Sequence, residues 1–189
     1  MSAAPEKIGT LAAPTLVLDP NGTGETRWED CVPGRTEVPR HLDEIPVLGI
    51  TPFGADEPVT APGWCFRRTP RPGQGRLTGR PTVGLVLVLI SPRHPEGAQP
   101  LRDWADFIHL NHIAAAGVPG YTMVTPYENH GDGPRFLHFY EIDDDDPEAT
   151  YKRMTPLVKA RLSREDFKEW TGHPELRIEY VSTYRLIRD

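Results

Sequence analysis

The chain has 189 residues, with 21 Lys and Arg against 27 Asp and Glu, for a formal net charge of −6. That length accommodates one domain or two small ones with a proper core, and the negative charge without a basic stripe argues against nucleic acid as a partner. Cys31 and Cys65 form neither a metal spacing nor a disulfide framework, and no apolar run is long enough to cross a membrane. With no signal-peptide pattern at the N-terminus, these features predict a cytoplasmic protein with reduced thiols and no membrane partner.

The first half of the chain holds most of the proline and glycine, which predicts loops and short strands. A weak helical pattern centres on Thr26-Arg-Trp-Glu-Asp30, between turn signals. The predicted segments are a flexible tail (1–13), a strand (16–18), the helical patch (25–46), two more strands (47–51 and 63–67) and a Pro/Gly/Arg linker (69–82).

The second half gives clearer patterns. Residues 83–90 are uniformly apolar and rich in branched side chains, so we expect a strand covered on both faces. Asp146 followed by Pro147 is a strong helix start, and Gly117 with Pro119 a strong helix end. The predicted segments are a strand (83–90), a helix (100–117), two strands (121–125 and 134–142), a helix (147–162), a short helix (163–170) and a last strand (178–187).

From residue 83 onward the order is therefore strand, helix, strand, strand, helix, strand. This is the order of a ferredoxin-like unit, an antiparallel sheet with helices on one face. Because the first strand is apolar throughout, the other face of the sheet must also be covered.

A weak internal repeat offers one way to cover that face. His41 to Gly49 and His112 to Gly120 share the same spacing, and residues 62–68 resemble residues 134–140. If the repeat is real, residues 14–68 form a degenerate first unit and the protein is a self-contained pseudo-dimer. If the similarity is chance, residues 14–68 are an extended arm and residues 83–189 need a second chain in a homodimer.

The second half also resembles a known family. The residues that carry this resemblance are His112, Pro119-Gly120, Pro134-Arg-Phe136 and Tyr184-Arg-Leu-Ile187. They are similar to the dimeric α/β-barrel superfamily, in its EthD-like branch, over about residues 83–188, although Leu110-Asn111 stands where the family usually has an acidic pair. The resemblance implies two sheets packed into a barrel, with a ligand cavity between each sheet and its helices. Family members include polyketide cyclases, cofactor-free monooxygenases, decarboxylases, haem proteins and proteins without known activity, so the fold does not select a function.

The candidate catalytic residues are His112, which continues the apolar row of its helix, with His138, Tyr140 and Tyr121 as helpers. A near-neutral imidazole exchanges protons with an activated carbon or a carbonyl oxygen, and a tyrosine hydroxyl stabilises the enolate that develops. Residues expected to contact the substrate are Trp104, Ile108, His109, Tyr127, His41 and Trp64.

Structural alternatives exist for these residues. His112 can cap the turn at residues 118–120 without any catalytic role, and the strand at residues 134–142 can face Leu137 and Phe139 to the ligand instead of His138 and Tyr140. His109, His112 and His138 are also metal or haem ligand types, although their spacing is a weak signal.

These observations favour an enzyme without a cofactor, cyclase- or lyase-like, acting by histidine acid–base catalysis on a hydrophobic polyketide-like or aromatic molecule. Two alternatives are a cofactor-free monooxygenase acting on an electron-rich aromatic and a non-catalytic small-molecule-binding protein.

Overall fold

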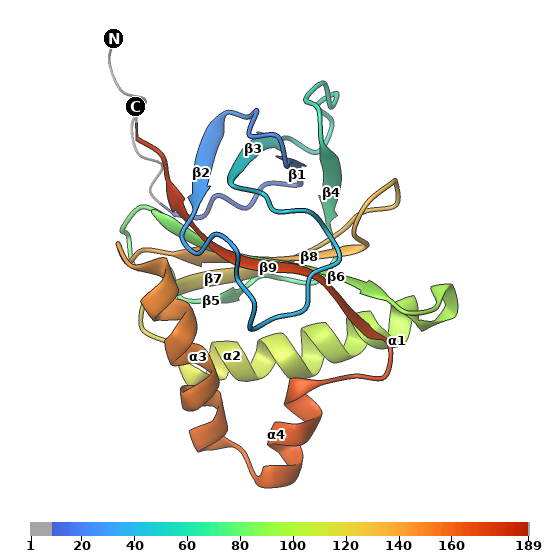
Figure 1. The fold of residues 1–189 in the computed structure, drawn as a ribbon, viewed down its shortest axis with the longest axis vertical. Coiled ribbons are helices and arrows are strands. Elements are labelled where there is room, and N and C mark those ends of the chain that lie inside the picture. Colours follow the sequence, from blue (N-terminus) through green and yellow to red (C-terminus); the bar gives the residue numbers. More distant parts are fainter. Residues whose placement is uncertain (1–8, 189) are drawn as a thin grey trace.

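The computed structural model describes residues 9–188. Strands dominate the first half of the chain, and helices appear only after residue 94 (Figure 1). The strands are β1 (Thr15–Asp19), β2 (Thr26–Asp30), β3 (Val47–Phe53), β4 (Trp64–Arg68), β5 (Gln74–Gly75), β6 (Gly84–Pro92), β7 (Tyr121–Glu128), β8 (Phe136–Ile142) and β9 (Leu176–Leu186).

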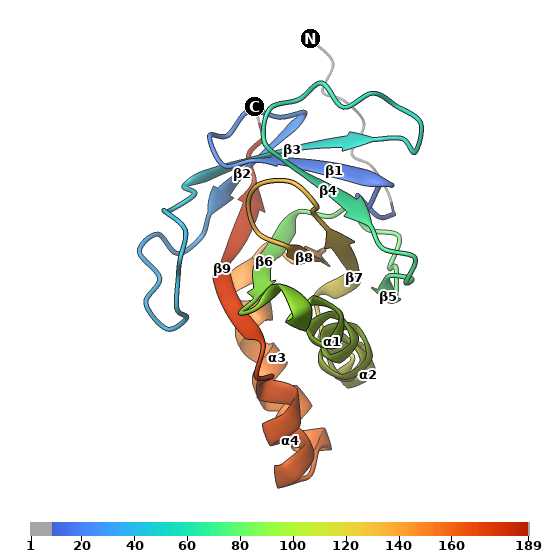
Figure 2. The ribbon, with the colours of Figure 1, turned by 90° about the vertical axis from the view of Figure 1, so that its right-hand side faces the viewer.

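Eight of these strands form one closed antiparallel barrel in the order β4-β1-β3-β2-β9-β6-β8-β7, with β4 pairing back onto β7. The short strand β5 pairs with β7 outside the barrel. Two seams join the halves: Trp28 pairs with Leu186 between β2 and β9, and Arg68 pairs with Tyr127 between β4 and β7. Figure 2 shows the first-half strands lying across the strands of the second half.

The ferredoxin-like dimeric α/β-barrel expected from the sequence is therefore wrong as a description of this fold. The strands of the second half do not form an open sheet under helices, because the four strands of the first half continue that sheet and close it. The order of elements after residue 83 could be predicted because each element has its own local sequence pattern. The two seams join strands far apart in the chain and leave no local pattern.

The helical patch predicted around Thr26 is also wrong, because those residues form β2. Trp28 is fully buried and Asp30 nearly so, whereas Arg27 and Glu29 are exposed. This alternation has the period of a strand with one face in the barrel.

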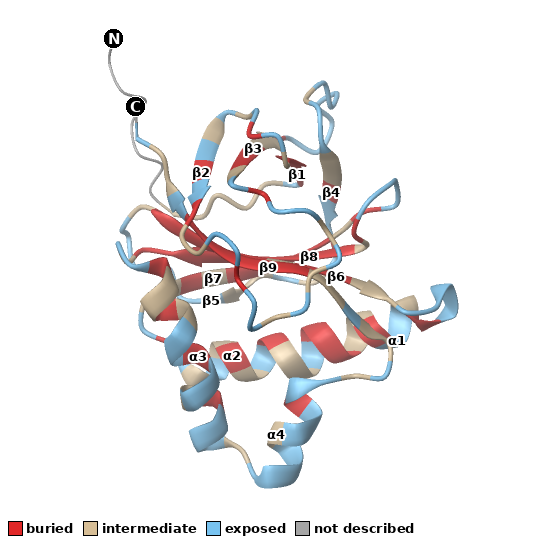
Figure 3. Ribbon diagram, viewed as in Figure 1, coloured by how far each residue is buried: buried red, intermediate tan, exposed pale blue. Residues whose placement is uncertain are grey.

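Large apolar side chains fill the barrel interior. The barrel strands accordingly include long stretches of buried residues, red in Figure 3. Along β6, Leu85, Leu87 and Leu89 point into this interior, and Val86 and Ile90 pack on the helix side. Both faces of the strand are covered, as its uniform apolar sequence predicted. The interior is therefore packed, and the cavity described below lies outside the barrel wall.

The helices lie on the outer side of the barrel wall, against β9 and β6 (Figure 1). Gly117 ends the first helical stretch in the left-handed conformation, with φ of 60°, and the Asp146 side chain caps α3 by accepting the Ala149 N–H at 2.9 Å. The helical segments are a 3₁₀ turn (Pro95–Gly97), α1 (Ala98–Trp104), a π-helical segment (Ala105–His109), α2 (Leu110–Ala116), α3 (Pro147–Arg161) and α4 (Arg164–Thr171).

Residues 1–8 of the predicted flexible tail lie outside the described residues. Residues 11–13 pack against the barrel core, and the Leu11 N–H and Thr10 hydroxyl donate to the buried Glu141. The predicted linker holds β5, and its Arg71 pairs with Asp106 at 2.7 Å. The remaining domain boundaries stay predictions.

Candidate functional site

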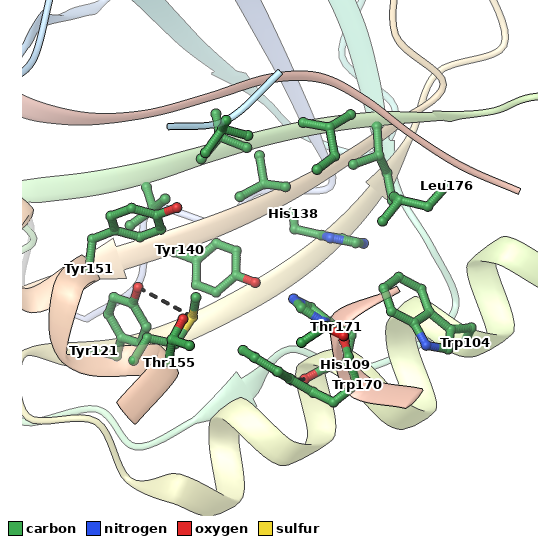
Figure 4. Close-up of a pocket in the computed structure, with 17 residues that line it drawn as sticks. Trp104, His109, Tyr121, His138, Tyr140, Tyr151, Thr155, Trp170, Thr171 and Leu176 are labelled. Carbon is green, nitrogen blue, oxygen red and sulfur yellow. Dashed lines mark hydrogen bonds between the residues drawn. The ribbon is translucent and has the colours of Figure 1, made fainter. Parts of the chain in front are cut away.

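A cavity of about 240 Å³ lies between the outer face of the sheet and the helices. Figure 4 shows Tyr121 and Tyr151 at one end, His138 and Tyr140 in the middle, and Trp104 and Leu176 at the other end. Its lining residues are Val38, Val86, Val88, Ile90, Trp104, His109, Tyr121, His138, Tyr140, Tyr151, Met154, Thr155, Trp170, Thr171, Leu176, Ile178 and Val181.

Strand β8 supplies the central polar groups. His138 and Tyr140 alternate with Leu137 and Phe139, which lie in the barrel core. Of the two orientations that the sequence left open, the structure therefore has the one with His138 and Tyr140 on the cavity side.

Two β-bulges adjust the other strands to the cavity. In β9 the pairing shifts so that Leu89 faces Tyr180 but Ile90 faces Ile178, which leaves Glu179 as the extra residue. Ile178 then lies on the cavity side together with Val181. A similar shift at Thr122 in β7 places Tyr121 beside Tyr140, with ring centroids 5.5 Å apart. Each bulge thus reverses the side-chain alternation and adds wall to the cavity.

The π-helical segment positions His109. Its imidazole stacks on Trp170, with ring centroids 4.8 Å apart and planes within 9°, and lies 5.1 Å from the Trp104 ring. Its Nδ1 is 2.8 Å from the Trp170 carbonyl oxygen, and the Trp170 Nε1–H donates to the His109 carbonyl at 3.1 Å. A carbonyl only accepts, so Nδ1 carries the proton and Nε2 of the neutral ring is left with a free lone pair. π-Helical turns are often found at functional sites.

Burial keeps the titratable groups of the cavity uncharged. Desolvation lowers the pKa of His138 to about 3 and that of His109 to about 4, with a smaller contribution from a neighbouring histidine in each case. It also raises the pKa of the Tyr121 and Tyr140 hydroxyls well above their ordinary value. At neutral pH the site therefore holds neutral imidazoles and intact hydroxyls.

No Lys, Arg, Asp or Glu among residues 9–188 lines the cavity. Asp106, an acid outside the cavity, has its Oδ1 4.0 Å from His138 Nε2, too far for a direct hydrogen bond. Its carboxylate accepts a hydrogen bond from Arg71 at 2.7 Å. Burial raises the Asp106 pKa, and the Arg71 guanidinium works against that rise. The cavity is thus suited to an uncharged ligand.

Five of the ten residues proposed from the sequence meet in this cavity, namely Trp104, His109, Tyr121, His138 and Tyr140. His109, expected only to contact substrate, is here the histidine with the defined tautomer. The apolar row of the helix favoured His112, three residues further along the same helical stretch, over His109.

The other five lie elsewhere. His112, the first candidate for acid–base catalysis, is partly buried near His109 and does not line the cavity. Ile108 packs beside Leu101 and Trp104. Tyr127 lies in the barrel core with its hydroxyl donating to the Ala13 carbonyl at 2.8 Å, and Trp64 packs against that core. His41 is exposed, with Nδ1 2.7 Å from the Ile178 carbonyl oxygen.

Sequence reasoning missed Trp170, Tyr151 and Val38 as cavity residues. Trp170 is the buried residue of the amphipathic helix α4, and that pattern predicts burial without saying against what. Val38 comes from the segment between β2 and β3, which crosses in front of β9 in Figure 1. Nothing in the local sequence indicates that crossing.

Within the part of the chain that the structure describes, no three His, Cys, Asp or Glu side chains are grouped to hold a metal ion. Over the same residues, no helix is both long and apolar enough to span a membrane. Cys31 and Cys65 are free.

Comparison with family models, curated proteins and solved structures found no match to this chain. The EthD-like resemblance inferred from short motifs therefore has no support from these comparisons. What stands of it is a compact α+β fold built on an eight-stranded antiparallel barrel.

Proposed function

We propose that the chain binds a small, uncharged, largely apolar aromatic molecule that carries a hydroxyl or carbonyl group. The observation that carries this proposal is the Tyr140 hydroxyl, which belongs to a side chain 2% exposed and lines a cavity without charged residues. No hydrogen-bond partner for it is found among residues 9–188, and its oxygen is not one of the sealed, unpaired side-chain atoms of those residues, so it is open to the cavity. A ligand oxygen bound in the cavity would accept a hydrogen bond from this hydroxyl, whereas a wholly apolar ligand would cover it and leave it unpaired at a cost.

The size and walls of the cavity support the same ligand class. About 240 Å³ is slightly below the roughly 300–1,000 Å³ typical of ligand sites, which suits a molecule of one or two fused rings. Trp104, Trp170 and Tyr121 offer aromatic surfaces for stacking or edge contacts.

Binding is tested with 2-naphthol and 2-methylnaphthalene, which have similar shape but differ in the hydroxyl. Their affinities are measured by quenching of tryptophan fluorescence, because Trp104 and Trp170 line the cavity. We expect Tyr140→Phe to weaken 2-naphthol binding about three- to tenfold, the effect of one hydrogen bond, and to leave 2-methylnaphthalene unchanged.

Tyr127→Phe is the matched control, because it removes a buried hydroxyl whose partner is the Ala13 carbonyl in the barrel. It is expected to lower stability without changing either affinity. Failure of both naphthalenes to bind the unmodified protein would refute the proposal.

A second candidate function, proton transfer at a carbon beside a carbonyl, is favoured by the tautomer of His109. Its free Nε2 would remove the proton, and the Tyr140 hydroxyl would donate to the enolate oxygen that forms. With a pKa of about 4, His109 is a weak base, so only slow turnover is expected unless the bound ligand stabilises the imidazolium. This chemistry uses protein side chains alone.

The test is deuterium exchange into the enolisable carbon of 2-tetralone in D₂O, followed by NMR. Exchange above the buffer rate that is lost in His109→Gln, with 2-tetralone affinity retained, supports catalysis. Saturable binding of 2-tetralone without faster exchange means that the site only binds. Monooxygenase activity, the other alternative from the sequence, stays a prediction that oxygen-uptake measurements would test.

A further inference from the structure

A second hollow, of about 520 Å³, adjoins the cavity at the end where Trp104 and Leu176 lie (Figure 4). It shares Leu176 and Ile178 with the cavity and opens to solvent, and we refer to it as the vestibule. Its lining residues are Pro39, His41, Arg93, His173, Leu176, Arg177 and Ile178.

The vestibule is cationic although the whole chain is acidic. Two arginines and two histidines line it, and no carboxylate of the described residues does, whereas the formal net charge of the chain is −6. Arg93 is exposed, and its side chain has no hydrogen-bond or ion-pair partner within residues 9–188. The charge of Arg177 is partly neutralised by an ion pair, because its Nε lies 3.3 Å from Glu179 Oε1.

Glu175, next in sequence to the vestibule residue Leu176, is already engaged by another residue. Glu175 accepts the backbone N–H of His94 at 3.0 Å and lies 3.2 Å from the His94 ring. It does not line the vestibule. Arg93 therefore faces the hollow as an uncompensated cation.

The two histidines present polar atoms to the same space. His41 Nδ1 donates to the Ile178 carbonyl at 2.7 Å, which leaves its Nε2 free. His173 Nδ1 accepts the Glu175 N–H at 3.1 Å, so its neutral ring carries the proton on Nε2 and donates there. The His173 ring is 5.7 Å from the Trp104 ring, which forms part of the cavity wall, so the vestibule and the cavity are direct neighbours.

We propose that the vestibule binds the anionic group of an amphipathic ligand, a carboxylate or a phosphate, whose aromatic part fills the neighbouring cavity. This inference rests on the proposed function and specifies its ligand class. A planar guanidinium is well suited to carboxylate and phosphate oxygens, and the His173 Nε2–H adds a neutral donor beside it. The cavity excludes charge and the vestibule attracts it, so a ligand of this kind has a single orientation.

The inference is tested with 3-(2-naphthyl)propanoate and its primary amide, which differ in charge but hardly in shape. At low salt we expect the acid to bind about two- to fivefold more tightly than the amide, as for a partly exposed ion pair. That difference should shrink as NaCl is added, because exposed charges are screened, while the amide affinity stays constant.

Arg93→Gln should remove the preference for the acid and leave amide affinity unchanged. The matched control is Arg27→Gln, which deletes an exposed positive charge on β2, and it should keep the preference. A naphthylethyl phosphate measured beside the propanoate identifies which anion fits better, and a preference for either anion over the amide supports the inference.

The failures of the two proposals are distinguishable. Equal affinity for acid and amide, or a preference that survives Arg93→Gln, overturns the vestibule site while the cavity proposal stands. Loss of binding of acid, amide and 2-naphthol alike overturns the cavity proposal, and the vestibule inference with it.

Discussion

The two cavity histidines couple the stability of the protein to pH. An unfolded histidine has a pKa of about 6.5. In the folded chain, burial holds the pKa of His138 at about 3 and that of His109 at about 4. At pH values between the folded and the unfolded pKa, the unfolded state binds more protons than the folded state. The stability that the neutral histidines contribute above pH 6.5 is therefore lost as the pH falls.

We predict that the free energy of unfolding drops by up to about 2 kcal/mol per histidine between pH 6.5 and pH 5. Urea unfolding at the two pH values measures this drop. His138→Gln should reduce the pH dependence, since glutamine does not titrate. NMR titration provides the direct check, and imidazole resonances of His109 and His138 that titrate near pH 6.5 would contradict the prediction.

At the scale of elements, Gly117 ends the helical stretch that carries His109. Its φ of 60° is left-handed, and an added Cβ would meet no atom within 4 Å. Gly117→Ala should therefore destabilise the fold by about 1 kcal/mol for conformational reasons alone.

Gly172 is the matched control, because it is equally open around an added Cβ but extended, with φ of −162°. Gly172→Ala should be neutral or slightly stabilising, since alanine adopts that conformation freely. Thermal unfolding of the two variants tests the pair. Equal melting temperatures would mean that the left-handed turn does not define the end of α2.

Local sequence signals predicted the elements well where they carry their own pattern. The apolar run of β6, the Asp146-Pro147 helix start and the Gly117 helix end are each local properties of a few residues. The bulges at Thr122 and Glu179 have no such signature, because they depend on which residue of the neighbouring strand is paired. The sequence therefore predicted only part of the candidate site. It identified His138 and Tyr140 on β8, but the tertiary contacts that place His109 in the cavity are visible only in the structure.

For the whole molecule, barrel closure is the property that the sequence did not reveal. The β2–β9 seam joins Glu29 to Arg185, and the β4–β7 seam joins Arg67 to Glu128. Pairings over such separations are decided by the total apolar surface that they bury. A weak internal repeat suggested that residues 14–68 cover the second-half sheet, and it gave no strand register.

These seams lead to a prediction about residues 83–189 alone. Without the first half, the barrel-facing side chains of β6, β8 and β9, among them Leu87, Phe139 and Tyr184, lose the strands that cover them. Exposed apolar surface of that extent drives association, and β7 and β9 become free edges that can pair with another chain. We expect this segment to form dimers or aggregates at concentrations where the full chain is monomeric.

Native mass spectrometry and light scattering on both proteins measure this difference. Adding residues 9–82 as a separate chain should restore a one-to-one complex, because it supplies β1–β4 to both seams. A segment 83–189 that stays monomeric, with a cooperative unfolding transition and native near-UV circular dichroism, would show that the barrel is not the unit that holds the second half folded. A dimer with restored tryptophan burial would instead show that two second halves can replace the missing strands, so that coverage of the barrel face decides the stability of the cavity-bearing half.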